Sequence, residues 1–142
     1  MTKEEFIQRF HMRSLPASVH NFRYPQQLKS AAVLIPIVSD QNQLNVLLTK
    51  RASHLTHHPG QISFPGGKAE PFDRDLTATA LRETEEEIGL VAPSINVLGQ
   101  LNPYQTISGY EVTPIVAIVT NSKSYHIDKN EVSEVFQVPL TH

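Results

Sequence analysis

The feature that most constrains this chain is a run without glycine or proline, residues 73–88, which follows a glycine pair at 66–67. Alanine, leucine, arginine and glutamate dominate the run, and these are good helix formers. Asp73 and Asp75 supply the short acceptors and negative charge that favour a helix start. Gly89 is the residue type that ends helices in a left-handed cap. The run therefore predicts a helix over residues 73–88.

The helix period places four charged side chains on one arc. With 3.6 residues per turn, an arc of about 140° holds Arg82, Glu83, Glu86 and Glu87. The opposite arc holds Leu81, Ile88 and Ala78, with Thr84 at its edge, and Glu85 lies outside the acidic arc. One face can pack on a core, while the other presents three carboxylates and a guanidinium.

Three carboxylates near a helix C-terminus are unfavourable for the helix itself, because they oppose its dipole and repel one another. A divalent cation would reverse both penalties, and Mg²⁺ takes carboxylate oxygens together with water and phosphate oxygens. A solvated charged face is the alternative for an isolated acidic run. The upstream glycine pair, the arginine within the cluster and the glycine stop favour a metal site.

These residues resemble the Nudix box, whose pattern is Gly, five residues, Glu, seven residues, Arg-Glu, an aliphatic, any residue, Glu-Glu, any residue, Gly and an aliphatic. Here the pattern is matched by Gly67, Arg82-Glu83, Glu86-Glu87 and Gly89-Leu90. There are three departures: Asp73 stands at the first Glu position, one extra residue separates it from Arg82, and Thr84 replaces an aliphatic. They put the role of Asp73 in question and leave the Arg-Glu and Glu-Glu core intact.

A second informative stretch lies upstream of the glycine pair. Lys50 and Arg51 stand side by side at the end of a predicted strand. They are either a solvated strand end or a phosphate grip, in which Arg51 can bind bidentately. The loop that follows contains His54, His57 and His58, and without cysteine or a spaced carboxylate we interpret these histidines as polar surface rather than a zinc site.

The same stretch resembles the signature that accompanies the Nudix box in the coenzyme A pyrophosphatase branch. The matching residues are Leu48-Thr49-x-Arg51, His54-Leu55 and His58-x-Gly60-Gln61-Ile62-x-Phe64-Pro65-Gly66-Gly67, with Thr106-Ile107-Ser108-Gly109-Tyr110 further along. The likeness covers about residues 31–140. It implies cleavage of CoA or an acyl-CoA to 3′,5′-ADP and 4′-phosphopantetheine, with Mg²⁺ or Mn²⁺ as cofactor.

The resemblance also implies roles for particular residues. Glu86 and Glu87 are expected to bind metal, and Glu83 to be either a ligand or the general base. Arg82 would orient the carboxylates, and Lys50, Arg51, Gly66 and Gly67 would contact the substrate. Glu131 is a further candidate ligand from a loop, with a solvated loop glutamate as the open alternative.

The remaining pattern predicts one α/β domain over residues 1–142, and the resemblance implies an α/β/α sandwich with a mixed sheet. Residues 1–29 are expected to form a helix and a loop. Strands are expected at 31–38, 44–49, 61–64, 95–101, 110–120 and 132–138, with Pro36 and Pro114 marking edges or bulges. The sandwich calls for a further helix beyond 142; either the chain is shortened or the N-terminal helix covers that face.

Composition excludes several classes of protein. The chain has no cysteine, which rules out disulfides and thiolate chemistry, and a net charge of −2 gives no basic footprint for nucleic acid. No apolar run approaches the ~20 residues that span a membrane, and the N-terminus does not resemble a signal peptide, so we expect a cytoplasmic protein. Its expected partner is a small nucleotide, and homodimer formation is left open.

Two rival functions remain. One is a Nudix hydrolase for ADP-ribose, NADH or another dinucleotide. The other is a catalytically inactive module that binds a nucleotide. A substrate panel separates the first from a CoA pyrophosphatase, and a turnover assay with Mn²⁺ separates the second.

Overall fold

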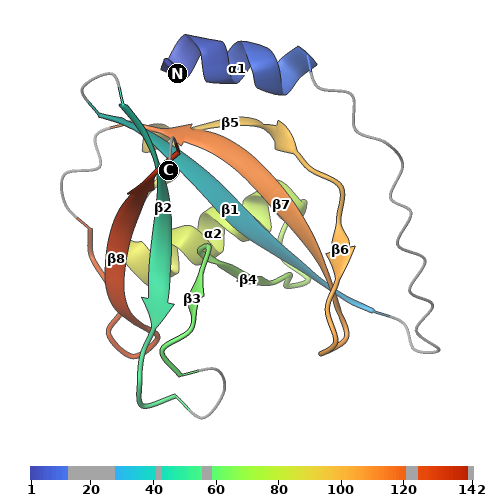
Figure 1. Cartoon of the computed structure of the whole chain (residues 1–142). Helices are drawn as coiled ribbons and strands as arrows, with labels where there is room; N and C mark the ends of the chain where they lie inside the picture. Colours follow the sequence, from blue (N-terminus) through green and yellow to red (C-terminus); the bar gives the residue numbers. More distant parts are fainter. Residues whose placement is uncertain (13–27, 41–42, 56–58, 121–124, 141–142) are drawn as a thin grey trace.

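The computed structural model describes residues 1–12, 28–40, 43–55, 59–120 and 125–140. In these residues a mixed sheet of eight strands lies between two helices (Figure 1). Two central strands, β1 (Lys29–Asp40) and β7 (Tyr110–Val119), run parallel to each other. β2 (Gln43–Arg51) and β5 (Ile95–Gln100) flank them in antiparallel orientation. The predicted α/β class is therefore confirmed.

Four shorter or outer strands complete the sheet. β3 (Ile62–Ser63) and β8 (Val132–Pro139) pair with β2, β4 (Gly66–Lys68) pairs with β1, and β6 (Tyr104–Gln105) pairs with β7. A 3₁₀ turn, η1 (Ala92–Ser94), precedes β5. β6 lies between the strands predicted at 95–101 and 110–120, where no strand was predicted, so it is a difference from the sequence prediction.

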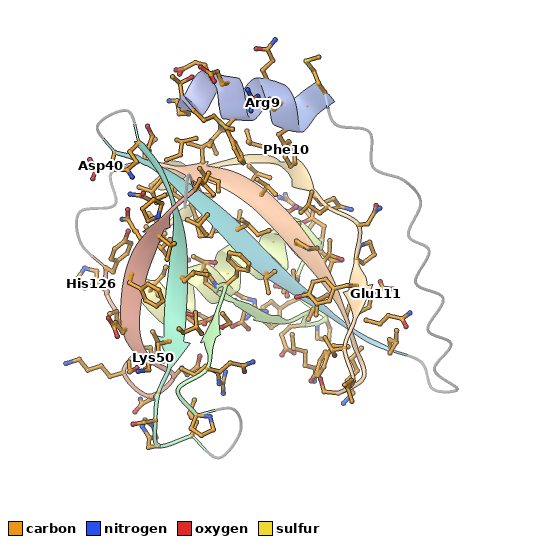
Figure 2. All side chains as sticks on the ribbon, viewed as in Figure 1. Arg9, Phe10, Asp40, Lys50, Glu111 and His126 are labelled. Carbon is orange, nitrogen blue, oxygen red and sulfur yellow. The ribbon has the colours of Figure 1, made fainter. Side chains whose placement is uncertain are left out.

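The two helices pack on opposite faces of the sheet because successive strand residues point to opposite sides. α2 (Leu76–Ile88) packs through Ala80 on Ala32, Leu34, Ile115 and Ala117. α1 (Lys3–Met12) packs through Phe10 on Ile37, Leu44, Val116 and Ile118. Figure 2 shows Phe10 between α1 and the sheet. The N-terminal helix thus covers the second face, and neither described helix is long and apolar enough to span a membrane.

The two strand prolines do not mark the sheet edge. Pro36 and Pro114 lie in the central strands β1 and β7, where the sequence predicted an edge or a bulge. Each falls between the segments that pair with two successive antiparallel partners, β4 and β2 on β1, and β6 and β5 on β7. A residue without an N–H donor is tolerated at such a gap.

The α2 boundaries follow from its caps. The Asp75 carboxylate accepts a hydrogen bond from the Ala78 N–H at 2.8 Å, and Gly89 adopts φ 79° in a left-handed cap. The helix therefore begins after Asp75, and Asp73 lies outside it, whereas the sequence predicted a start at 73. Most of the loop predicted within residues 1–29 lies outside the described residues, as do His57 and His58.

Candidate active site

Arg82 is the centre of an ion-pair network at the start of the site. Its Nε and Nη2 donate to the two carboxylate oxygens of Asp73, both at 2.9 Å. Its Nη1 donates to Glu83 at 3.1 Å and to Glu86 at 3.4 Å. Its Nη2 also donates to the carbonyl oxygen of Lys68 at 3.2 Å. Arg82 therefore holds Asp73, Glu83, Glu86 and the Lys68 carbonyl in place, while its role in catalysis stays a prediction.

Asp73 is fixed as the main partner of that guanidinium. It also accepts hydrogen bonds from the Glu70 N–H at 2.9 Å and from the Thr79 hydroxyl at 2.8 Å. The hydrogen bonds from Arg82 hold the pKa of Asp73 well below its usual range, with the Glu70 and Thr79 bonds acting in the same direction. Asp73 stands where the Nudix box has a glutamate, one residue further from Arg82 than the pattern gives. In the structure it holds Arg82 in place.

The packed face of α2 differs from the one that the helix period predicted. Its buried residues are Thr79, Ala80, Thr84, Glu87 and Ile88. The Thr84 hydroxyl donates to the Ala80 carbonyl at 2.7 Å, which satisfies this polar group where an aliphatic residue was expected. The acidic arc turns toward β4 rather than toward open solvent, so part of it is buried.

Glu87 is the buried member of the acidic arc. Its side chain accepts a hydrogen bond from the Gly66 N–H at 3.0 Å, and the residue is 9% exposed. Burial raises the pKa of Glu87 to about 8; the Gly66 hydrogen bond opposes this shift, and the charges of Glu83 and Glu131 add to it. The prediction of an exposed position for Glu87 is wrong, because β4 covers this part of the helix.

Glu83 lies against the backbone of Gly67. A Cβ added to Gly67 would stand 2.6 Å from the Glu83 carboxyl carbon. A Cβ added to Gly66 would instead stand 2.3 Å from the carbonyl oxygen of Ala32 in β1. Burial raises the pKa of Glu83, and its ion pair with Arg82 opposes that shift. The glycine pair therefore brings β4 close to both β1 and the acidic helix, while its contact with substrate stays a prediction.

Two groups outside α2 act on the same carboxylates. Glu131 raises the pKa values of Glu83 and Glu87, and Arg51 lowers that of Glu87. The Glu131 carbonyl accepts from the Ala52 N–H at 2.9 Å, which ties its loop to the end of β2. The loop that carries Glu131 therefore lies near α2, and the role of Glu131 as a metal ligand stays a prediction. Lys50 is exposed, and its substrate contact stays a prediction.

We call Glu83, Glu86, Glu87 and Glu131 the acidic cluster. Within the described part of the chain, no three acidic, histidine or cysteine side chains stand close enough together to hold a metal ion as they are placed. The donor chemistry nevertheless fits a hard divalent cation, because all four side chains offer carboxylate oxygens. A cation would also stabilise the charge of buried Glu87. The residues therefore fit Mg²⁺ or Mn²⁺.

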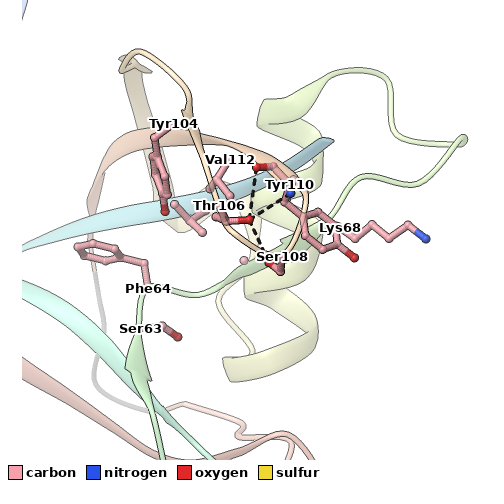
Figure 3. Close-up of a pocket in the computed structure, with 12 residues that line it drawn as sticks. Ser63, Phe64, Lys68, Tyr104, Thr106, Ser108, Tyr110 and Val112 are labelled. Carbon is pink, nitrogen blue, oxygen red and sulfur yellow. Dashed lines mark hydrogen bonds between the residues drawn. The ribbon is translucent and has the colours of Figure 1, made fainter. Parts of the chain in front are cut away.

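A cavity of about 300 Å³ lies on the other side of β4. Its lining includes Phe64, Tyr104, Tyr110, Thr106, Ser108 and Lys68. Ala31 and Val33 also line it, and they alternate with the β1 residues that face α2, so the cavity opens on the opposite face of the sheet. Figure 3 shows the rings of Phe64 and Tyr104 at one end and Lys68 at the other.

Sequence reasoning assigned no role to these cavity residues. Phe64 and residues 106–110 belong to the branch signature, and this was the feature of the sequence that could have pointed to them. That signal did not show that β4 and the segment before β7 would meet across a cavity. Gly66 and Gly67 line the cavity as well, so β4 is shared between it and the acidic cluster.

Comparisons with known proteins agree with this architecture. The NUDIX domain family matches residues 28–141. The chain is 44% identical over 144 residues to "Uncharacterized Nudix hydrolase NudL" of Yersinia enterocolitica, covering 98% of this chain and 69% of the relative. It is 45% identical over 139 residues to the NudL of Yersinia pestis, covering 96% and 69%.

Solved structures show the same fold. A C. elegans Ap4A hydrolase binary complex aligns with a TM-score of 0.65 at 18% identity, covering 75% of this chain and 77% of that one. The Nudix hydrolase RenU of M. smegmatis aligns at 0.66 and 22%, covering 84% and 76%. The NUDIX domain of Shewanella oneidensis NrtR, complexed with ADP ribose, aligns at 0.59 and 24%, covering 99% and 85%. The chain belongs to the Nudix family of hydrolases, which act on nucleoside diphosphate derivatives with divalent metal ions such as Mg²⁺ or Mn²⁺.

Proposed function

We propose that this protein hydrolyses the diphosphate of CoA or an acyl-CoA to 3′,5′-ADP and (acyl-)4′-phosphopantetheine. The observation that carries the hydrolase assignment is the acidic cluster, in which Glu87 is buried against β4 and accepts from the Gly66 N–H. The branch signature between Leu48 and Gly67 carries the choice of CoA.

The acidic cluster would hold the cation beside the diphosphate. When bound, Mg²⁺ or Mn²⁺ neutralises charge on the phosphate oxygens and lowers the pKa of a coordinated water. Glu86, Glu87 and Glu131 are the proposed ligands. In the reaction the water oxygen would form a bond to one phosphorus of the diphosphate and give up a proton to a base. The bond between that same phosphorus and the bridging oxygen would break, so that each half of the substrate leaves as a monophosphate.

Glu83 is the proposed general base or a further ligand. Burial raises its pKa, which brings the carboxylate closer to the basicity that a proton acceptor needs near neutral pH. Its contact with Gly67 and its hydrogen bond to Arg82 restrict where the carboxylate can lie. Both features suit a group that must meet a water molecule in one position.

Arg82 and Arg51 would have different tasks. Arg82 already pairs with Asp73, Glu83 and Glu86, so it positions carboxylates. Arg51 acts electrostatically on Glu87 from the end of β2, which suits an added contact to a phosphate oxygen. Lys50 would add positive charge nearby. Gly66 and Gly67, in turn, would allow close approach of the substrate to β4.

Product analysis tests the proposal. Purified protein with Mn²⁺ and CoA should give 3′,5′-ADP and 4′-phosphopantetheine in equal amounts, separable by anion-exchange chromatography. ADP-ribose and NADH belong in the same panel, and ADP-ribose is the sharper rival because the NrtR NUDIX domain is complexed with it. Faster turnover of ADP-ribose than of CoA would overturn the CoA assignment and keep the hydrolase. No turnover of any diphosphate would favour an inactive binding module.

A further inference from the structure

The cavity beyond β4 has the chemistry of a site for a flat aromatic group. Phe64, Tyr104 and Tyr110 supply three rings to its lining, and Ser63, Thr106 and Ser108 supply hydroxyls. No lining residue is acidic, and Lys68 is the one charged side chain among them, all of which lie in the described residues. Aromatic rings with hydroxyl partners favour a heterocyclic base over a flexible aliphatic chain.

The position of the cavity connects it to the acidic cluster. The Gly66 N–H donates to Glu87 on one side of β4, and Gly66 and Gly67 line the cavity on the other. A diphosphate held at the cluster would therefore have one of its two substituents beside the cavity. A volume of about 300 Å³ is enough for a nucleoside.

Resting on the proposed function, we infer that this cavity binds the nucleoside half of the substrate, with the base against Phe64 and Tyr104 and an anionic group on the ribose at Lys68. Figure 3 shows Lys68 extending away from Phe64, at the opposite end of the cavity. Its backbone is fixed because its carbonyl accepts from Arg82 at 3.2 Å. A ribose phosphate at this end would meet an ammonium group.

The hairpin between β6 and β7 gives the cavity its wall. The Thr106 hydroxyl accepts from the Tyr110 N–H at 3.1 Å and shares a hydrogen bond with Ser108 at 3.0 Å. This wall is therefore held by its own short-range bonds. Tyr104 is half exposed in a two-residue strand, so we expect the fold to tolerate a substitution there.

Calorimetric binding of the two product halves in saturating Mn²⁺ tests the inference without turnover. Phe64→Ala and Tyr104→Ala should each weaken 3′,5′-ADP about tenfold and leave 4′-phosphopantetheine unchanged. Tyr104→Phe keeps the ring and should bind like the parent protein. The comparison of two ligands within one variant is independent of the fraction folded. Weaker 4′-phosphopantetheine binding instead would place the other half of the substrate in the cavity and overturn the inference, as would no binding of 3′,5′-ADP by the parent.

Lys68→Ala tests the ribose phosphate. It should weaken 3′,5′-ADP about tenfold and change 5′-AMP, which lacks the 3′-phosphate, by less than twofold. Arg9→Ala on exposed α1 removes the same charge far from the cavity and should change neither. Equal loss for both nucleotides would overturn the role of Lys68. If CoA is not hydrolysed but these binding differences appear, the proposed reaction fails and the nucleoside site stands.

Discussion

The two sides of β4 carry different kinds of side chain. On the α2 side, charged groups hold one another: Asp73 alone accepts four hydrogen bonds, two of them from Arg82. On the cavity side, rings and hydroxyls dominate and Lys68 is the only charge in the lining, again counting described residues. The α2 side therefore holds a network of charged groups, whereas the other side offers a cavity whose shape and hydroxyl groups can select a ligand.

This difference suggests that the α2 side sets the rate of the reaction and that the cavity side sets the choice of substrate. Groups fixed by several partners keep the geometry that a chemical step requires. The cavity wall carries an almost fully exposed residue, Ile107 at 97%, so its sequence can change at little cost to the fold. We expect variants on the α2 side to lower the rate for every substrate, and variants on the cavity side to reorder the substrates.

The largest expected effect is on the α2 side. Glu83→Gln removes the carboxylate but keeps its shape, so turnover of CoA should fall about a hundredfold or more while the melting temperature holds. Glu85→Gln is the matched control, because Glu85 is exposed and its contribution to the helix is its backbone carbonyl at the C-cap. Steady-state kcat with Mn²⁺ measures both. Similar activity of the two variants would contradict the assignment of faces on α2.

The glycine pair gives a second comparison within two adjacent residues. Gly67→Ala would place a methyl group on the Glu83 carboxylate, so kcat should fall on the order of tenfold to a hundredfold with a modest change in stability. Gly66→Ala would meet the β1 backbone at Ala32, which cannot move aside, so the main loss should be in folding. Urea unfolding and kcat together separate the two. A Gly67→Ala variant with full activity would show that Glu83 need not lie there.

The buried carboxylate predicts a pH effect on stability. Folded Glu87 has a pKa of about 8 against an ordinary 4.5, so without metal the folded protein binds this proton more tightly than the unfolded chain does. The stabilisation is complete below pH 4.5 and is lost as the pH rises to about 8, lowering the free energy of unfolding by on the order of 5 kcal/mol.

Urea unfolding in EDTA across this pH range measures the slope. Glu87→Gln, which cannot titrate, should flatten it. Millimolar Mn²⁺ should raise the melting temperature most at the alkaline end, because it stabilises the charged carboxylate. Equal melting temperatures in Mn²⁺ and EDTA at pH 7.5 would contradict the metal site.

The sequence was sufficient for the features that depend on local pattern. Apolar runs between turn residues predicted the strands, and Gly89 predicted the end of α2. The motif spacing predicted that Arg82 and the glutamates would share one region. Glu131 was predicted as a further candidate ligand, and its charge raises the pKa values of Glu83 and Glu87. The helix period, the apolar runs, the glycine cap and the motif spacing are all properties of neighbouring residues, which a single chain displays directly.

What the sequence could not provide depends on partners distant in the chain. A helical wheel gives the angle of Glu87 but not that β4 covers it, so its burial was missed. Pro36 and Pro114 signal a missing donor, yet their place in central strands depends on where four other strands end. The cavity needs Phe64 and Tyr104 to meet, and no local pattern encodes that contact.

The smallest expected effect is that of Arg51, and it tests whether this residue contacts the diphosphate or the ribose phosphate. It ends β2, is half-buried, and lowers the pKa of Glu87, so it belongs to the α2 side rather than to the cavity that contains Lys68. A charged hydrogen bond to a phosphate is worth roughly 1.5–3 kcal/mol, so Arg51→Ala should lower kcat/KM on CoA about tenfold, and Ser53→Ala should do less. Dephospho-CoA, which lacks the 3′-phosphate, should suffer equally from Arg51→Ala if the arginine contacts the diphosphate. A loss confined to CoA would mean that Arg51 reads the ribose phosphate, and the division of labour across β4 would then be wrong at this residue.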